Sequence, residues 1–161
     1  MDILTHAALW FSIVSVAIMT GVYFTFSAFV MRSLDAIEAP AGMKAMQSIN
    51  RIIVKSAFLP SFFASTLVCA ALTVRASLDM AAPGAPWMMV GAALYVVGMF
   101  GVTLVGNVPL NNTLEATPAD GPEAKAIWAI YMRQWTRWNH VRTLSCTASL
   151  VFLVLAMAQR I

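Results

Sequence analysis

Charged residues are the scarcest component of this chain of 161 residues. Asp, Glu, Lys and Arg together make up 11% of the sequence, whereas hydrophobic residues make up 60%. Soluble domains carry about 25% charged residues, so this composition excludes an ordinary soluble domain. The net charge of +3 is small and gives no reason to expect nucleic acid as a partner.

Cysteine and histidine are also rare, with two of each. Cys69 and Cys146 fall at different depths of their apolar runs, which excludes a disulfide and predicts apolar packing positions. His6 and His140 belong to opposite ends of such runs, about 30 Å apart, and cannot share a metal or a haem within one chain. Because the runs contain no Asp or Glu, zinc and di-iron sites lack their ligands. We expect no metal site.

Sequence signatures of nucleotide binding are missing as well. The chain has no Walker loop, no dinucleotide glycine fingerprint and no nucleophile elbow. The glycines between Gly98 and Gly106 lie inside an apolar run with no strand before them. The sequence therefore does not indicate a nucleotide-dependent enzyme or a serine hydrolase.

Long apolar runs are what the sequence has instead. Each is close to or above the roughly 20 residues that cross hydrocarbon as a helix. They cover residues 3–31, 52–74, 86–108 and 141–158. Backbone in lipid must satisfy its own hydrogen bonds, which predicts helices. The first run lacks a basic start and is too long for a signal peptide. We predict one all-α domain over residues 1–161, an integral membrane four-helix bundle in the lipid bilayer.

Basic residues are distributed unevenly between the two sides of this bundle. Eight of the ten belong to loops one and three and the adjoining helix ends: Arg32, Lys44, Arg51, Lys55, Lys125, Arg133, Arg137 and Arg142. Only Arg75 and Arg160 fall on the other side. The positive-inside rule predicts loops one and three in the cytoplasm and both termini outside, in a bacterial inner (plasma) membrane.

Prolines suggest where helices start and stop. Pro40 can open a short interfacial helix in loop one, and Pro122 can open a helix that runs unbroken from loop three into the fourth span. Pro109 is expected to end the third helix, and Pro60 to kink or loosen the second. Small residues at four-residue spacing, such as Ala17 and Gly21, predict close helix packing, within one bundle or between copies of a homo-oligomer.

Aromatic residues follow one face of the helix that leads into the fourth span. Trp128, Tyr131 and Trp135 recur at three- and four-residue steps, which is typical of an aromatic belt at the membrane surface. Arg133 and Arg137 lie on other faces, where basic residues attract anionic lipid.

Polar residues gather at one end of the bundle and form a candidate site. Its members are Asn50, Asn107, Asn111, Trp138, Asn139 and Arg142, with His140 beside them. Asn111 and Asn112 also suit a turn. Arg142 lies four or five residues inside its helix, where it either snorkels to the interface or pairs with an anion in the bundle. His140 suits a general base near neutral pH, and equally an interfacial histidine facing water.

Four short motifs resemble the anthrone oxygenase family. They are Gly21-x-Tyr23-Phe24, Met46-Gln47-x-Ile49-Asn50, Asn107-x-Pro109-x-Asn111 and Trp138-Asn139-x-x-Arg142. The resemblance implies a four-helix membrane protein that oxidises a lipophilic phenolic compound of anthrone type with dioxygen and without a cofactor. Such chemistry needs a base, a partner for the anion and a dry site.

The resemblance also implies roles for individual residues. His140 would be the base, and Arg142 would hold the oxyanion with the amides of Asn50, Asn107, Asn111 and Asn139. Tyr23 and Trp138 would stack on the aromatic substrate. A second interpretation stays open: a non-catalytic membrane protein that binds a quinone, haem or lipid, or a subunit of a larger membrane assembly. A transporter would show repeats, broken helices or intramembrane charges, of which the sequence has few.

Overall fold

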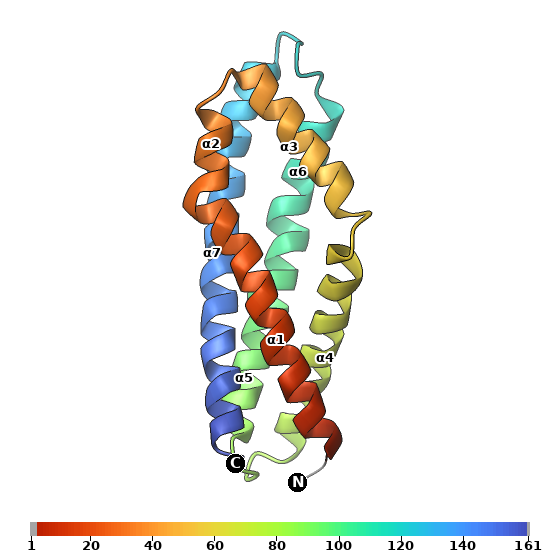
Figure 1. Cartoon of the computed structure of the whole chain (residues 1–161), viewed down its shortest axis with the longest axis vertical. Coiled ribbons are helices and arrows are strands. Elements are labelled where there is room, and N and C mark those ends of the chain that lie inside the picture. Colours follow the sequence, from red (N-terminus) through yellow and green to blue (C-terminus); the bar gives the residue numbers. More distant parts are fainter. Residues whose placement is uncertain (1–2, 161) are drawn as a thin grey trace.

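The computed structural model describes residues 3–160, and their regular structure is entirely helical (Figure 1). Four helical stretches are long and apolar enough to cross a membrane: Ile3–Asp35, Phe58–Leu78, Ala85–Ala116 and Ala124–Ala158. They run alternately up and down and bring the two ends of the chain to one end of the bundle. The predicted all-α membrane four-helix bundle is confirmed.

Three of the four stretches are long rods, and two of them contain π-helical turns. The first rod is α1 (Ile3–Thr25), the π-helical η1 (Phe26–Val30) and α2 (Met31–Asp35). The third is α5 (Ala85–Tyr95), the π-helical η2 (Val96–Gly101) and η3 (Thr103–Asn107), and α6 (Val108–Ala116). The fourth is α7 (Ala124–Ala158).

The fourth position of the bundle is divided between two helices. α4 (Phe58–Leu78) has 21 residues, against 32 to 35 in the rods, and fills only the lower part. α3 (Ala39–Ile53) crosses the upper part and contacts α2, α6 and α7 (Figure 1). A short break at residues 54–57 separates them. The second span therefore begins at Phe58 and not at residue 52 as predicted.

The prolines behave differently from one another. Pro40 lies in the first turn of α3, as predicted, and α7 starts at Ala124, two residues after Pro122, and continues unbroken as expected. The kink expected at Pro60 is not needed, because this residue lies in the first turn of α4, where backbone N–H groups lack intrahelical partners anyway.

Pro109 does not end the third helix, which continues through α6 to Ala116. A proline inside an α-helix clashes with the carbonyl four residues earlier. Here that carbonyl belongs to Val105 in η3, and the wider π-helical turn gives the ring room. The sequence-based prediction was wrong because a π-helical turn leaves no mark in the spacing of apolar residues.

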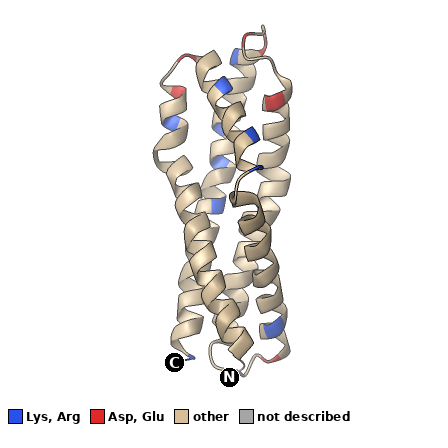
Figure 2. Cartoon of the chain, turned by 45° about the vertical axis from the view of Figure 1, so that its right-hand side comes forward, with Lys and Arg blue, Asp and Glu red and all other residues tan. Residues whose placement is uncertain are grey.

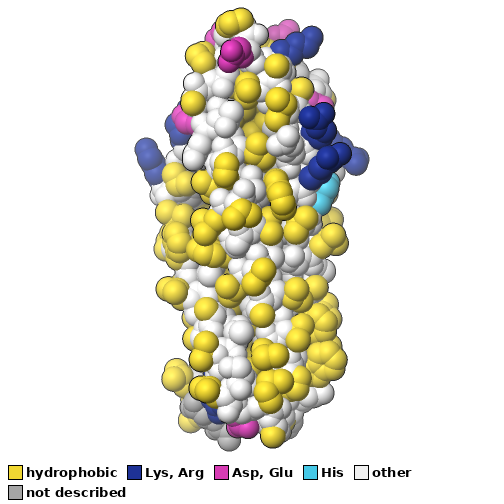
Figure 3. All heavy atoms as spheres, turned by 180° about the vertical axis from the view of Figure 1, so that it is seen from behind, with side chains coloured by type: hydrophobic (Ala, Val, Ile, Leu, Met, Phe, Trp, Pro, Cys, Tyr) yellow, Lys and Arg dark blue, Asp and Glu magenta, His cyan; other side chains and the backbone are white. Residues whose placement is uncertain are grey.

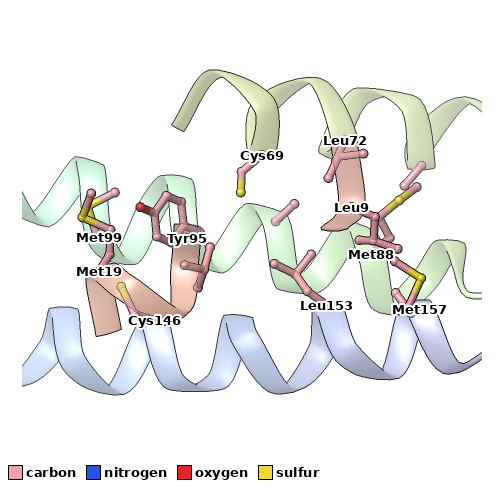
Figure 4. Close-up of a cluster of buried hydrophobic side chains, with 14 of the residues drawn as sticks. Leu9, Met19, Cys69, Leu72, Met88, Tyr95, Met99, Cys146, Leu153 and Met157 are labelled. Carbon is pink, nitrogen blue, oxygen red and sulfur yellow. The ribbon is translucent and has the colours of Figure 1, made fainter. Parts of the chain in front are cut away.

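Two buried clusters fill the bundle. The lower one joins α1, α4, α5 and α7 around Leu9, Tyr95 and Leu153, and it holds Cys69 and Cys146 as free thiols (Figure 4). The upper one lies beneath α3, where Met43 and Met46 meet α7. Lys and Arg gather in the half of the bundle away from the termini (Figure 2), as the charge bias requires.

Glycines on two faces of the bundle give a matched stability test. A Cβ on Gly98 would overlap the Cβ and Oγ of Ser145 on α7, whereas a Cβ on Gly21 would meet nothing within 4 Å. Gly98→Ala should therefore force η2 and α7 apart and destabilise the protein by about 1–3 kcal/mol. Gly21→Ala should leave stability unchanged or slightly raised. Thermal unfolding in detergent measures both, and equal melting temperatures would contradict the close contact.

Candidate functional site

A cavity of about 200 Å³ lies between the two buried clusters, beside the break between α3 and α4. α1 and η1, α3, α4, η3, α6 and α7 all contribute to its wall, which is mostly apolar. Its polar lining residues are Tyr23, Asn50, Thr103, Asn111, Trp135 and Arg142. Among the described residues that line it there is no carboxylate, histidine, lysine or cysteine.

Arg142 is a buried cation that has no counterion among residues 3–160. Its side chain enters the wall from α7, and the residue is only 5% exposed. Nη2 donates to Asn139 Oδ1 at 2.7 Å, and Nη1 donates to Thr103 Oγ1 at 3.3 Å. Nε is buried with no partner in the described part of the chain. The ion pairs found within residues 3–160 all involve other basic residues.

Two aromatic rings flank the guanidinium of Arg142. Its Cζ lies 4.4 Å from the ring centroid of Tyr23 and 5.1 Å from that of Trp135. Cations over aromatic faces are stabilised by the ring quadrupole, by about 0.5–2 kcal/mol. Neutral hydrogen-bond partners and aromatic rings therefore hold this charge in place, and neither neutralises it.

Asn139 ties Arg142 to the first rod. Its Nδ2 donates to the backbone carbonyl of Tyr23 at 2.8 Å and to Ser27 Oγ at 2.7 Å, while its Oδ1 accepts from Arg142. Asn139 is fully buried. It positions the cation from behind and does not itself line the cavity.

Two further asparagines belong to the cavity wall. Asn111 lies in the middle of α6, and its Oδ1 accepts hydrogen bonds from Tyr131 Oη and Trp135 Nε1, both at 2.8 Å. It orients these rings, so the turn interpretation does not apply to it. Asn50, on α3, has a buried Nδ2 that forms no well-aligned hydrogen bond among residues 3–160, and its amide lies beside the hydroxyl of Tyr131. A donor that a ligand can use therefore lies in the wall.

Three predicted site residues lie away from the cavity. Asn107 is buried in η3 and donates to the backbone carbonyl of Trp135 at 3.2 Å. Trp138 is 40% exposed and packs over Gly106. His140 is exposed on another face of α7, and its Nδ1 lies 2.9 Å from Ser27 Oγ. Each residue of an α-helix turns the chain by about 100°, which places His140 on nearly the opposite face of α7 from Arg142. Trp138, four residues before Arg142, lies nearer the same face, and its ring packs over Gly106 and does not line the cavity.

The aromatic belt predicted on α7 is wrong for Trp128, Tyr131 and Trp135. All three are buried, and they stack on one another at centroid distances of 5.8–5.9 Å under α3. Trp135 and Thr103 belong to the cavity wall, although the sequence analysis does not predict them there. For Trp135 the spacing gives a signal, because this residue lies seven positions before Arg142 and therefore on the same helix face.

Metal-ligating side chains do not converge in the described structure. Among residues 3–160 no three His, Cys, Asp or Glu side chains lie close enough together to hold a metal ion. The groups that face the cavity are hydrogen-bond donors and a cation, which suit an oxygen atom that carries negative charge. π-helical turns contribute Phe26 from η1 and Thr103 from η3 to the wall, and such turns are frequent at functional sites.

The fold and the site define an integral membrane helical bundle with an internal, mostly apolar cavity and a buried arginine in its wall. A model of the anthrone oxygenase family matches residues 48–152, roughly two thirds of the chain. The chain belongs to the anthrone oxygenase family. The matched stretch contains Asn50, Asn111 and Arg142 and begins after Tyr23. Searches of curated proteins and of solved structures found no match.

Proposed function

We propose that this protein is a membrane-embedded oxygenase that binds a flat, lipophilic phenolic compound of anthrone type in the cavity and promotes its oxidation by dioxygen without a cofactor. The observation that carries the proposal is Arg142, a buried cation that faces an apolar cavity and has no counterion in the part of the chain that the structure describes. Membership of the anthrone oxygenase family supports the same reaction.

The first step of such a reaction creates an anion. An anthrone loses a proton from its activated ring carbon, and the remaining charge rests largely on the oxygen across the ring. A cation held in surroundings of low dielectric stabilises that oxygen far better than water does. The free Nδ2 of Asn50 supplies a second donor. None of the described residues that line the cavity is a carboxylate or a histidine able to accept this proton, so the proton passes to water at the mouth.

The later steps need only the substrate and dioxygen. The electron-rich carbon transfers electrons to dioxygen and forms a carbon–oxygen bond, and the resulting peroxide anion takes back a proton from water to give a hydroperoxide. The hydroperoxide then loses water and leaves a carbonyl group. One oxygen atom of dioxygen remains in the quinone product and the other leaves as water, so no external reductant is consumed. The protein contributes by stabilising the anion and excluding bulk water.

Apolar side chains mark the mouth of the cavity. Val54, Phe63, Leu104 and Val108 line it and are exposed on the outside of the bundle. Arg142 lies about 24 Å from the lower end of α7, which places the cavity near the upper edge of a hydrocarbon layer about 30 Å thick. The substrate therefore enters from the bilayer. With the basic half in the cytoplasm, as the charge bias predicts, this edge is the cytoplasmic one.

The test adds an internal counterion to Arg142. Thr103 lines the cavity and accepts a hydrogen bond from Arg142, so Thr103→Asp places a carboxylate beside the guanidinium. Oxygen uptake with an anthrone should fall about a hundredfold, the usual effect of losing oxyanion stabilisation. Thr103→Asn has the same size and no charge, and should stay within about fivefold of the parent protein. Equal losses in both variants would show that the charge of Arg142 plays no part.

Binding without catalysis is the second candidate, favoured because no carboxylate or histidine is among the described residues that line the cavity. A quinone carbonyl would accept hydrogen bonds from Arg142 and Asn50. A haem would find no histidine among the lining residues, because His140 lies on the outer face of α7. The absorption spectrum of the purified protein separates the two candidates: bound quinone together with oxygen uptake that is insensitive to Thr103→Asp would identify a binding protein.

A further inference from the structure

A groove runs along the seam between the first rod and α7, on the opposite side of α7 from Arg142. Its upper end is lined by Arg32, Asp35, Arg133 and Thr136. Its lower end is lined by Phe24, Ala28, Leu144 and Thr147. Ser27 and His140 line both hollows, which have volumes of about 420 and 400 Å³ and adjoin where Ser27 Oγ and His140 Nδ1 lie 2.9 Å apart. We call the two together the α1–α7 groove.

The two ends of the α1–α7 groove differ in chemistry. The upper end carries two arginines and one aspartate, and none of the ion pairs formed within residues 3–160 involves them. It therefore has an excess of positive charge. The lower end has no charged residue. Seen from behind, the molecule shows Lys and Arg side chains gathered beside a histidine above a largely apolar surface (Figure 3).

The depth of the two ends matches the layers of a bilayer. Counted at 1.5 Å per residue from the end of α7, Leu144 lies about 21 Å and Arg133 about 37 Å along the helix. A hydrocarbon layer about 30 Å thick would contain Leu144 and leave Arg133 among the headgroups. The apolar end thus faces acyl chains, and the basic end faces phosphates.

We propose that the α1–α7 groove binds one anionic phospholipid. Its phosphate lies between Arg32 and Arg133, and one acyl chain follows Phe24, Ala28 and Leu144. Free phosphate would meet the same arginines, but it would make no use of the apolar half of the groove. Two adjoining hollows, one basic and one apolar, fit a molecule that has both parts. This assignment is independent of the chemistry in the cavity.

The experiment compares two arginines on the same helix. Arg133 lines the groove, whereas Arg137, one turn later and also exposed, is not among its lining residues. The full chain is placed in nanodiscs that contain phosphatidylcholine and phosphatidylglycerol, and retained lipid is counted by native mass spectrometry. The parent protein should keep one phosphatidylglycerol. Arg133→Ala should weaken retention about fivefold, the effect of one basic residue at a membrane surface, and Arg137→Ala should leave it unchanged.

A second variant probes the apolar end. Ala28→Trp fills the place of the acyl chain without changing charge, and it should also reduce retention while the protein keeps its melting temperature. Equal losses for Arg133→Ala and Arg137→Ala, or equal retention of the two lipids, would overturn the site in favour of general surface attraction. Displacement of the lipid by inorganic phosphate would show that the arginines bind phosphate alone and would overturn the assignment to a phospholipid.

Discussion

Replacement of Arg142 by methionine should abolish oxygen uptake with an anthrone without lowering the melting temperature. Activity should fall by about a hundred- to a thousandfold or more, because the variant loses the positive charge at the reacting oxygen. Stability should be unchanged or higher, since burial of an ion costs several kcal/mol and no carboxylate among residues 3–160 pairs with it. That cost exceeds the about 1–3 kcal/mol of leaving Asn139 Oδ1 without its donor. The thioether side chain fills much of the same space.

The combination of lost activity and retained stability is the distinctive part of this result. Replacement of a residue with a purely structural role would lower the activity and the melting temperature together. Arg142→Lys is the control, because it keeps the charge but cannot donate to Asn139 and Thr103 at once. It should retain an intermediate activity. Full activity in Arg142→Met would exclude Arg142 from the reaction, and a large fall in melting temperature would show that the cation is satisfied in a way the structure does not reveal.

Asn139→Leu should be the most destabilising single change in the site. The substitution removes the donors to the Tyr23 carbonyl and to Ser27, and it leaves Nη2 of Arg142 buried without an acceptor. Hydrogen bonds to charged groups contribute about 1.5–3 kcal/mol, and each buried partner left unsatisfied costs about 1–3 kcal/mol. We expect a loss of about 3–5 kcal/mol, measured by denaturation in detergent.

A double-variant cycle isolates the contact between Asn139 and Arg142. In Asn139→Leu with Arg142→Met, the unpaired guanidinium is gone, so the double variant should be more stable than Asn139→Leu alone. The coupling should amount to about 1–3 kcal/mol. Additive effects would mean that Asn139 acts on the first rod only and does not position the cation.

Large parts of this fold follow from the sequence because lipid permits so few alternatives. Apolar runs of sufficient length must be helices, and their number sets the bundle. Arg142 is predictable as a candidate site residue for the same reason, since ionisable residues inside apolar runs are rare and usually functional. The up-and-down path of the chain also predicts a polar cluster at one end of the bundle. In the structure, Asn50, Asn111 and Arg142 line one cavity, and Asn139 lies behind the wall and holds Arg142.

The remaining features depend on tertiary contacts that a single sequence does not encode locally. Trp128 and Trp135 match a membrane-surface belt in spacing, and only the position of α3 above them shows that they are buried. Pro109 ends a helix by local rules, and only η3 explains why the helix continues. His140 is adjacent to Asn139 in sequence, yet the rotation of α7 separates it from the cavity.

The division of the fourth bundle position between α3 and α4 has a kinetic consequence. α3 covers one side of the cavity and is attached by hydrogen bonds from Gln47 to α6 and the loop after it, and by two exposed ion pairs, Lys44–Asp120 and Arg51–Glu115. Salt weakens such exposed pairs, while the lower cluster is unaffected. We therefore expect the amides of α3 to be the first to exchange in hydrogen-exchange measurements. We also expect an anionic ligand to reach Arg142 faster as ionic strength increases, even though the affinity of that ligand for the arginine falls.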